Sequence, residues 1–243
     1  MKSLDVCDGP LKPVAADRSA LQLPLALRGE DEATFELFVA DPAFVQYLQQ
    51  VAEGKIQDWV WLQGPAGWGK THLLSAAYRK AGRAAGYLEA AALLASGPDS
   101  LAQIDGYELV LLDNVECALV PSWEEAWFHR LNRWRDAGVQ LVVASRQHPR
   151  NLQLGLPDLA SRLKMMVEVS IAPLDSPGRA ELLARRSAAR GFDLPPAVVS
   201  YLLSREARSA VELVGMLDRL GRESLRAQRK LTVPFVRQVL GGA

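Results

Sequence analysis

Residues Gly64-Pro65-Ala66-Gly67-Trp68-Gly69-Lys70-Thr71 form a glycine-rich octapeptide that fits the pattern G-x-x-x-x-G-K-[ST] at every fixed position. Glycines let backbone N–H groups curl around phosphate without steric clash, and the start of a following helix adds positive partial charge. The alternative, a turn that fits by chance, is disfavoured because a strand-like run precedes the octapeptide and a helical pattern follows it. We therefore expect it to bind the phosphates of a nucleotide, with Lys70 on the β and γ phosphates.

The segments on either side of the octapeptide predict an α/β fold. Compact apolar runs predict strands at residues 58–62, 86–89, 107–112, 139–144 and 167–171. Helical spacing of apolar residues predicts helices at 34–52, 72–83 and 123–137. Strands that alternate with helices are typical of a parallel sheet covered by helices on both faces.

The pattern changes at Pro173, after which no strand-like run appears. Four helices are predicted there, at residues 179–190, 195–203, 207–226 and 233–240. We therefore expect an α/β domain over residues 28–172 and a small all-α domain over residues 173–243. Residues 1–20 carry mixed charges, two prolines and no period, which predicts a disordered tail. A short apolar segment, residues 21–27, lies between the tail and the α/β domain.

Composition narrows the class of protein. The 243 residues include 28 Lys and Arg against 28 Asp and Glu, and 49% are hydrophobic, which excludes a wholly disordered chain. Zero net charge argues against nucleic-acid binding through bulk attraction. Two cysteines are too few for a disulfide scaffold or a zinc cluster, and no apolar run approaches the roughly 18 residues of a membrane span. We expect a cytoplasmic protein with no membrane contact.

The predicted strand at 107–112 ends at an acid, Asp113, which suits the second half of a phosphate site. Asp113 and the hydroxyl of Thr71 would hold Mg²⁺. The next residue is Asn114, and an amide cannot act as a general base. The sequence thus predicts a site that binds nucleotide and hydrolyses it weakly or not at all. Two alternatives stay open: Glu116 substitutes if its loop bends favourably, or another residue or a partner supplies the base.

Six stretches of the chain resemble the AAA+ family, and within it the Hda-like regulators of the DnaA-related branch. The resemblance runs from Gln22 to about Leu240. DnaA-like initiators also carry a C-terminal DNA-binding domain, which we do not expect here because the sequence ends at Ala243. The stretches are FELF (35–38), the octapeptide 64–71, LDNVE (112–116), LGLPDLASRL (154–163), RGFDLP (190–195) and AQRKLTVPFV (227–236).

The resemblance implies roles for single residues. In the family, the box that ends in Ser-Arg-Leu provides an arginine finger that acts on the nucleotide of a neighbouring molecule. The corresponding residue here is Arg162. The plain alternative is an exposed helix arginine in a surface ion pair. A lid arginine that touches the nucleotide corresponds to Arg208, with Arg205 as fallback. The first sensor corresponds to Ser145, where the family often has an acid. Residues 37–39 would shape the adenine pocket or simply pack in the core.

Residues Gln22-Leu23-Pro24-Leu25 resemble the short peptide by which such regulators bind the β sliding clamp of the replicative polymerase. A proline-stiffened segment can lay apolar side chains into a groove with little loss of entropy. The alternative is that this segment packs on its own domain. Its place between the tail and the fold favours clamp binding.

The resemblance, together with the nucleotide site, implies an adaptor that carries ADP (or ATP) with Mg²⁺, docks on DNA-loaded clamp and stimulates hydrolysis of ATP bound to DnaA. DNA would be met mainly through the clamp, and a homo-oligomer is possible. Two other functions compete: a loader or remodeller with its own ATP cycle, and an initiator that lacks its terminal domain. Asn114 disfavours the loader. Zero net charge disfavours the initiator, although residues 173–243, with 12 Lys and Arg against 7 Asp and Glu, leave some DNA contact possible.

Overall fold

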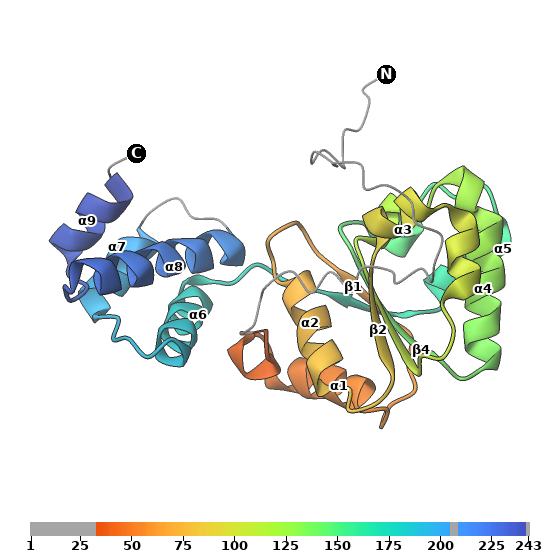
Figure 1. The fold of residues 1–243 in the computed structure, drawn as a ribbon, viewed down its shortest axis with the longest axis horizontal. Coiled ribbons are helices and arrows are strands. Elements are labelled where there is room, and N and C mark those ends of the chain that lie inside the picture. The colour runs from red at the N-terminus through yellow and green to blue at the C-terminus, as the bar shows by residue number, and fades with distance from the viewer. Residues whose placement is uncertain (1–32, 205–208, 242–243) are drawn as a thin grey trace, which may run out of the picture.

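The computed structural model describes residues 33–204 and 209–241 of the chain. Its centre is a five-stranded, wholly parallel sheet in the order β2-β3-β4-β1-β5 (Figure 1). The strands are β1 (Val60–Gln63), β2 (Ala85–Glu89), β3 (Leu109–Asp113), β4 (Gln140–Ser145) and β5 (Val167–Ser170). All five predicted strands are present, and the parallel sheet confirms the α/β prediction.

Successive strand residues pack on opposite faces of the sheet, as the two-residue period requires. In β3, for example, Val110 and Leu112 belong to one core, while Leu109 and Leu111 belong to the other. Because both faces are covered, the strands read as continuous apolar runs rather than as alternating ones.

Helices cover each face. On one face lie α1 (Pro42–Ala52) and α2 (Lys70–Lys80), together with the short 3₁₀ turn η1 (Phe35–Leu37). On the other lie α3 (Ala90–Ser96), α4 (Glu124–Asp136) and α5 (Pro157–Lys164), at the right of Figure 1. Further 3₁₀ turns connect these elements at Pro98–Gln103, Val115–Cys117, Pro121–Trp123 and Pro149–Asn151.

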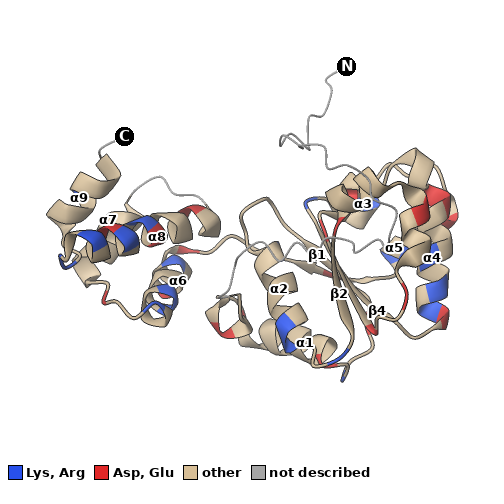
Figure 2. Cartoon of the chain, in the orientation of Figure 1, with Lys and Arg blue, Asp and Glu red and all other residues tan. Residues whose placement is uncertain are grey.

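The C-terminal part is a separate bundle of four helices, called the lid below and drawn at the left of Figure 1. It contains α6 (Ser176–Ala189), α7 (Pro196–Leu203), α8 (Ala210–Ala227) and α9 (Val233–Gly241). The lid has its own apolar core, in which Leu183, Leu202 and Leu217 are completely buried. Ser209 and Glu212 form a capping box that fixes the start of α8. Figure 2 shows that positions occupied by Lys or Arg recur along lid helices α6 and α8.

Two predictions about helices need correction. The helix expected over 34–52 is a 3₁₀ turn followed by a break and then α1. The break lies at Asp41-Pro42, where the Asp41 carboxylate accepts from Ala43 N at 2.8 Å and Pro42 occupies the first helical turn. This is a helix start signal inside a longer apolar pattern. Helix α3 was not predicted, and its sequence, AAALLAS, carries almost no polar face to reveal a period.

Among residues 33–204 and 209–241, no helix combines the length and apolar character that crossing a bilayer requires.

Candidate functional site

A cavity of about 420 Å³ lies between the α/β part and the lid. Residues 66–72 of the octapeptide and α2 form one wall, and side chains from α6 and α8 form the facing wall. Residues 37–39 and 171–174 close the remaining sides. A volume of this size suits a small organic ligand. The lining includes all of Leu37-Phe38-Val39, which places the predicted adenine-pocket residues at the cavity.

Two glycines let the octapeptide backbone follow its path. Gly67 and Gly69 have φ of +79° and +92°, in the left-handed region that favours glycine. A Cβ on Gly69 would lie 2.7 Å from Cε2 of Phe38, and one on Gly67 would lie 3.0 Å from Cβ of Ser209 in the lid. Val211 N also donates to Gly67 O at 3.2 Å. The start of α8 therefore rests directly on the phosphate loop.

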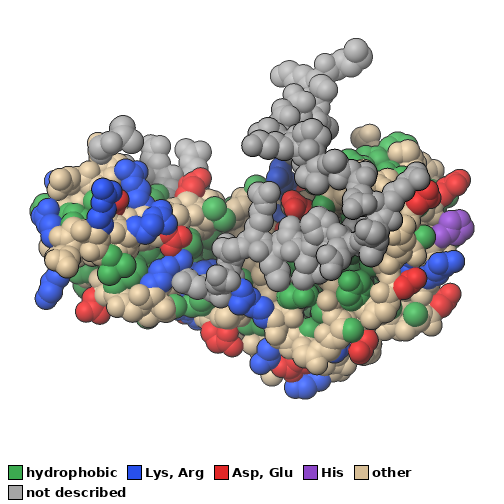
Figure 3. All heavy atoms as spheres, in the orientation of Figure 1, with side chains coloured by type: hydrophobic (Ala, Val, Ile, Leu, Met, Phe, Trp, Pro, Cys, Tyr) green, Lys and Arg blue, Asp and Glu red, His purple; other side chains and the backbone are tan. Residues whose placement is uncertain are grey.

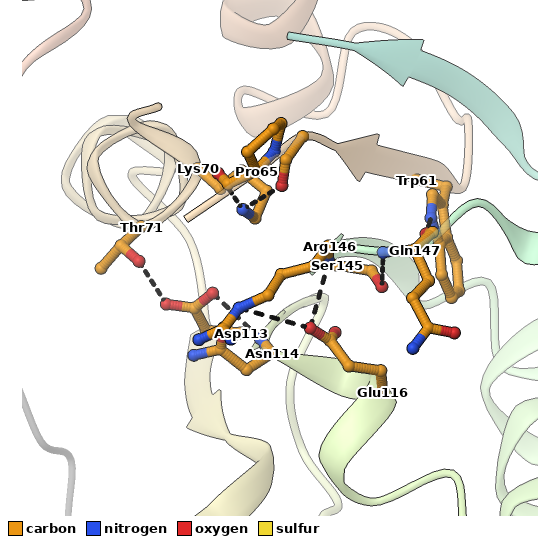
Figure 4. Close-up of polar contacts among 11 residues, drawn as sticks. Trp61, Pro65, Lys70, Thr71, Asp113, Asn114, Glu116, Ser145, Arg146 and Gln147 are labelled. Carbon is orange, nitrogen blue, oxygen red and sulfur yellow. Dashed lines mark hydrogen bonds and ion pairs between the residues drawn. The ribbon is translucent and has the colours of Figure 1, made fainter. Parts of the chain in front are cut away.

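Lys70 lies at the first turn of α2 and is buried. Its Nζ donates to the carbonyls of Gly64 at 2.5 Å and Pro65 at 2.9 Å (Figure 4). Burial lowers the pKa of the Lys70 ammonium, and the carboxylates of Asp113 and Glu116 oppose that shift. The loop carbonyls thus orient a cation at the place where nucleotide phosphates would lie.

Asp113 stands at the end of β3 and joins three partners. Its Oδ2 accepts from Thr71 Oγ1 at 2.7 Å, and its Oδ1 accepts from Asn114 N at 3.0 Å (Figure 4). The Oδ2 also accepts from the Tyr87 hydroxyl at 3.0 Å. Burial and the Asp113 carboxylate raise the pKa of the Tyr87 phenol far above its usual value, so the phenol stays a donor. Tyr87 was missed from sequence, because only the pairing of β2 with β3 brings it beside Asp113.

The residues predicted to hold Mg²⁺ fit that ion. The Thr71 hydroxyl and the Asp113 carboxylate are adjacent oxygen ligands, the type that Mg²⁺ prefers. Asp113 is 3% exposed and is not among the residues that line the cavity. The part of the chain that the structure describes has no cluster of three acids, histidines or cysteines. Mg²⁺ would therefore keep several waters and rely on nucleotide phosphates for further oxygens.

The Glu116 side chain is buried beside Arg146 and is not among the described residues that line the cavity, and its Oε2 has no hydrogen-bond partner among them. Its Oε1 accepts from the backbone N of Arg146 at 3.1 Å and lies 3.9 Å from the Arg146 Nε. Its side chain is only 5% exposed. Asn114 has a φ of +53° and lines the cavity. Its amide therefore lies at the cavity, directly after Asp113, as the sequence predicts. Within the described residues, the position next to Asp113 therefore offers no available carboxylate to the cavity.

The residue that faces the cavity at the end of β4 is Arg146 rather than Ser145. Ser145 is completely buried, and its Oγ accepts from Gln147 N at 3.0 Å. Arg146 lines the cavity, and Figure 4 shows its side chain running from the end of β4 toward Asp113 and Asn114. The signal that could have found it is its place directly after the last residue of the strand.

The lid is held on the α/β part by two arginines of α6. Arg185 donates from Nη1 to the carbonyls of Glu36 at 2.8 Å and Phe38 at 2.9 Å. Buried Arg186 contacts Nδ1 of His72 at 2.9 Å, and Nε2 of His72 contacts the Thr34 carbonyl at 2.8 Å. The Arg186 contact thus connects α6 of the lid to His72, the residue that follows Thr71.

Arg208 and Arg205, the candidate lid arginines, lie outside the described residues, as do the predicted tail (1–20) and the segment Gln22–Leu25. Ser209, the first described residue of this stretch, lines the cavity.

Arg162 lies elsewhere, on α5. It is not among the described residues that line the cavity. It forms no ion pair with any residue that the structure describes, in contrast to the plain alternative, and its Cζ lies 5.3 Å from the centre of the Phe128 ring. Figure 1 shows α4 and α5 together at the end of the α/β part that is away from the lid. A nucleotide contacted by Arg162 would therefore be bound to another molecule.

Comparison with known proteins bears on this arrangement. Residues 177–240 match the family model described as "Hda, lid domain". The fold is similar to that of domain III of the Thermotoga maritima replication initiation protein DnaA, with a TM-score of 0.74 and 21% identity over 87% of this chain and 96% of that one. The lid of this chain is thus similar to the Hda lid domain, and the whole chain has a fold similar to that of DnaA domain III.

Other solved structures have a similar fold. AMPPCP-bound DnaA from Aquifex aeolicus has a TM-score of 0.66 and 22% identity, over 82% of this chain and 69% of that one. The Thermotoga maritima RuvB Holliday junction branch migration motor has a TM-score of 0.65 and 14% identity, over 86% of this chain and 73% of that one. At these identities the likeness concerns the fold alone.

Proposed function

We propose that this Hda-like chain is a nucleotide-bound regulator of replication initiation that stimulates hydrolysis of ATP bound to the initiator DnaA. The observation that carries the proposal is the separation of two features within one chain. One is a cavity that can hold a nucleotide but offers no free carboxylate at the catalytic position. The other is an arginine, Arg162, that lies outside that cavity and in no ion pair with described residues.

In the proposed resting state the chain holds ADP (or ATP) with Mg²⁺. The octapeptide backbone and Lys70 bind the phosphates, Thr71 and Asp113 hold the ion, and residues 37–39 flank the base. The nucleotide lies between the α/β part and the lid, so its binding would stabilise their contact. AMPPCP-bound DnaA, which has a similar fold, supports the binding of an adenine nucleotide. We expect ADP to suffice, because an adaptor without turnover needs only a stabilised state.

The chain's own hydrolysis should be weak or absent. The side chain of Asn114 cannot accept a proton from water at neutral pH. The Glu116 side chain is 5% exposed and lies outside the described lining of the cavity, and its Oε1 accepts from Arg146 N. The competing function, a loader with its own ATP cycle, requires a base that these contacts do not supply.

Arg162 would act on the neighbour's nucleotide through its planar guanidinium. In phosphoryl transfer, negative charge is spread over the oxygens of the transferred group, and a positioned arginine stabilises that charge. Fingers of this kind are worth roughly 10³–10⁵ in rate. DnaA supplies its own nucleotide and water, and this chain supplies the cation.

The segment Gln22–Leu25 would bring the regulator to the clamp. We expect that replacing Gln22, Leu23 and Leu25 with alanine abolishes clamp binding and leaves the fold intact, because a docking peptide contributes little to the core. Binding to immobilised clamp measures the first effect, and a circular-dichroism melt measures the second. Clamp affinity within about twofold of wild type, well below the ~1.4 kcal/mol of a tenfold change, would remove this segment from the mechanism.

The same clamp assay separates the proposed function from its competitors. Neither a loader with its own ATP cycle nor an initiator requires the clamp. Wild-type chain that fails to bind clamp would therefore favour one of these functions.

A further inference from the structure

Helix α8 of the lid turns one side toward the cavity. Four residues on that side line the cavity: Val211, Val214, Gly215 and Asp218. Their spacing of three and four residues places them together, while leucines on the other side of α8 form part of the lid core. Among the described residues of α8, Asp218 is the one charged side chain in this lining.

The contact at the start of α8 shows which end of this side lies near the phosphates. Val211 N donates to the carbonyl of Gly67 at 3.2 Å, so the first turn rests on the phosphate loop. Val214 lies farther along, and both it and Val39 pack against the lid core. Asp218 lies seven residues beyond Val211, about 10.5 Å along the helix axis. A nucleotide can therefore extend along α8, with its phosphates beside Val211 and its base beside Val214.

Gly215 lies in the interior of α8, where glycine is less favourable than alanine because it loses more backbone entropy on folding. Its φ is outside the left-handed region, so the backbone does not require a glycine here. A Cβ built on Gly215 would meet no atom of the protein within 4 Å, so packing does not require one either. The absent side chain leaves open space in the cavity wall, which the flat ring of a purine can fill.

Asp218 lies one turn beyond Val214, on the far side from the phosphate loop. Its Oδ1 lies 2.7 Å from Nη2 of Arg190, the residue at which α6 ends, and its side chain is 31% exposed. The ion pair holds the carboxylate in place, and a carboxylate has lone pairs for more than one donor. Hydrophobic and charged side chains lie side by side on the lid surface (Figure 3), so its place in the cavity, rather than its charge, distinguishes Asp218.

The order of groups in an adenine nucleotide matches this arrangement. The sugar is attached at one edge of the purine, and the 6-amino group projects from the opposite edge. A ring beside Val214 and Gly215, with its phosphates toward Val211, turns that amino group toward Asp218. The amino group is a donor and the carboxylate is an acceptor. The same distance from the phosphate loop separates the Asp218 carboxylate from the place where a general base would have to act.

We propose that Gly215 and Asp218 form the base-recognition surface of the nucleotide site. Gly215 lets the purine ring lie against α8, and the Asp218 carboxylate accepts a hydrogen bond from the 6-amino group of adenine. This inference rests on the proposed binding of an adenine nucleotide and adds the residues that select its base.

The test of Asp218 compares two ligands of the full-length chain by calorimetry, with Mg²⁺ present. One is ADP, and the other is purine riboside 5′-diphosphate, in which hydrogen replaces the 6-amino group. Wild type should bind ADP at least about tenfold more tightly, because the second ligand leaves the carboxylate without that donor. Asp218→Ala should reduce the preference to within about twofold, and Asp218→Asn should keep at least about threefold, because its amide oxygen still accepts.

Two control variants separate recognition of the base from loss of charge or of the ion pair. Arg190→Gln breaks the ion pair but keeps the carboxylate of Asp218. Glu223→Gln removes an acid from the same helix, at a position that is not among the described residues lining the cavity. Both variants should keep the preference for ADP. A role of Asp218 in the structure of the lid alone would instead make Arg190→Gln resemble Asp218→Ala.

The test of Gly215 compares Mg-ADP with Mg-pyrophosphate, which has phosphates but no base. Gly215→Leu should weaken ADP binding at least about tenfold and leave pyrophosphate binding within about twofold, because leucine fills the space of the ring. Its melting temperature without ligand should equal or exceed that of wild type, since leucine favours helix more than glycine does. Gly215→Ala should also raise the melting temperature, and it should weaken ADP binding less than Gly215→Leu.

The outcomes distinguish two failures. Wild-type chain that binds neither Mg-ADP nor Mg-pyrophosphate would overturn the nucleotide proposal together with this inference. Three results would overturn the inference alone: equal binding of ADP and purine riboside diphosphate by wild type, an unchanged preference in Asp218→Ala, or tighter binding of GDP than of ADP. Equal losses of ADP and pyrophosphate in Gly215→Leu would overturn the role of Gly215.

Discussion

Replacing Arg162 with alanine should reduce stimulation of DnaA-bound ATP hydrolysis at least a hundredfold, a loss of about 2.7 kcal/mol of transition-state stabilisation. The reason is that the guanidinium is the only group this account assigns to the neighbour's phosphates. Arg162→Lys should restore little, since an ammonium is a point charge and cannot reproduce the planar fork. The measurement is the rate at saturating variant, with clamp and DNA present.

The same variant should otherwise behave as wild type. The cation–π contact with Phe128 is half-exposed, so its loss should cost about 0.5–1 kcal/mol of stability. Affinity for ADP and for clamp should not change, because Arg162 does not line the cavity. If Arg162→Ala stimulates normally, the finger must be another residue. Arg146 is then disfavoured, since it lines the chain's own cavity and pairs with Glu116, and Arg150, exposed beside α5, becomes the next candidate.

Replacing Lys70 or Asp113 with alanine should abolish the stabilisation of the chain by Mg-ADP. For wild type, ligand at a hundredfold excess over Kd should add about 2.7 kcal/mol to the free energy of unfolding. Lys70→Ala removes the cation from the phosphate loop. Asp113→Ala removes an ion ligand and also leaves the buried hydroxyl of Tyr87 without this acceptor, which should lower stability without ligand by about 1–3 kcal/mol.

Thermal melts with and without millimolar Mg-ADP measure both effects. Lys80→Ala is the matched control, because Lys80 lies on the same helix with its side chain 47% exposed and pairs only weakly with Glu53. It should keep the full ligand-dependent shift. Wild-type chain that shows no shift at millimolar ADP would contradict the nucleotide proposal itself.

The sequence predicted the parts of the site that local chemistry defines. The octapeptide needs glycine at Gly69, a fixed position of the pattern, because its φ of +92° lies in the region that favours glycine, so the pattern is recognisable without a structure. Asp113 was predicted because it ends a continuous apolar run. The parallel sheet was predicted from sequence runs that are apolar throughout, because strands buried on both faces have such runs.

The parts that the sequence did not reveal depend on contacts between distant segments. The Tyr87 hydroxyl donates to Asp113 on the neighbouring strand, and Arg146 N donates to Glu116, which is 30 residues away in the sequence. Neither pair has a sequence spacing that predicts the contact. The sequence favours Ser145 as a polar contact, but the two-residue period of β4 turns its side chain inward, and the next residue, Arg146, faces the cavity. Gly215 and Asp218 looked like ordinary members of an amphipathic helix.

The central claim is that this chain accelerates hydrolysis on another molecule rather than on itself, and the position of the label tests it. DnaA is preloaded with radiolabelled ATP and mixed with chain that carries unlabelled ADP, in the presence of clamp and DNA. We expect rapid release of labelled phosphate from this mixture. We expect almost none when the label is ATP loaded on this chain and DnaA is absent. Two results would contradict this claim. One is release of label from the first mixture at no more than the intrinsic rate of DnaA, and the other is rapid release from the second mixture.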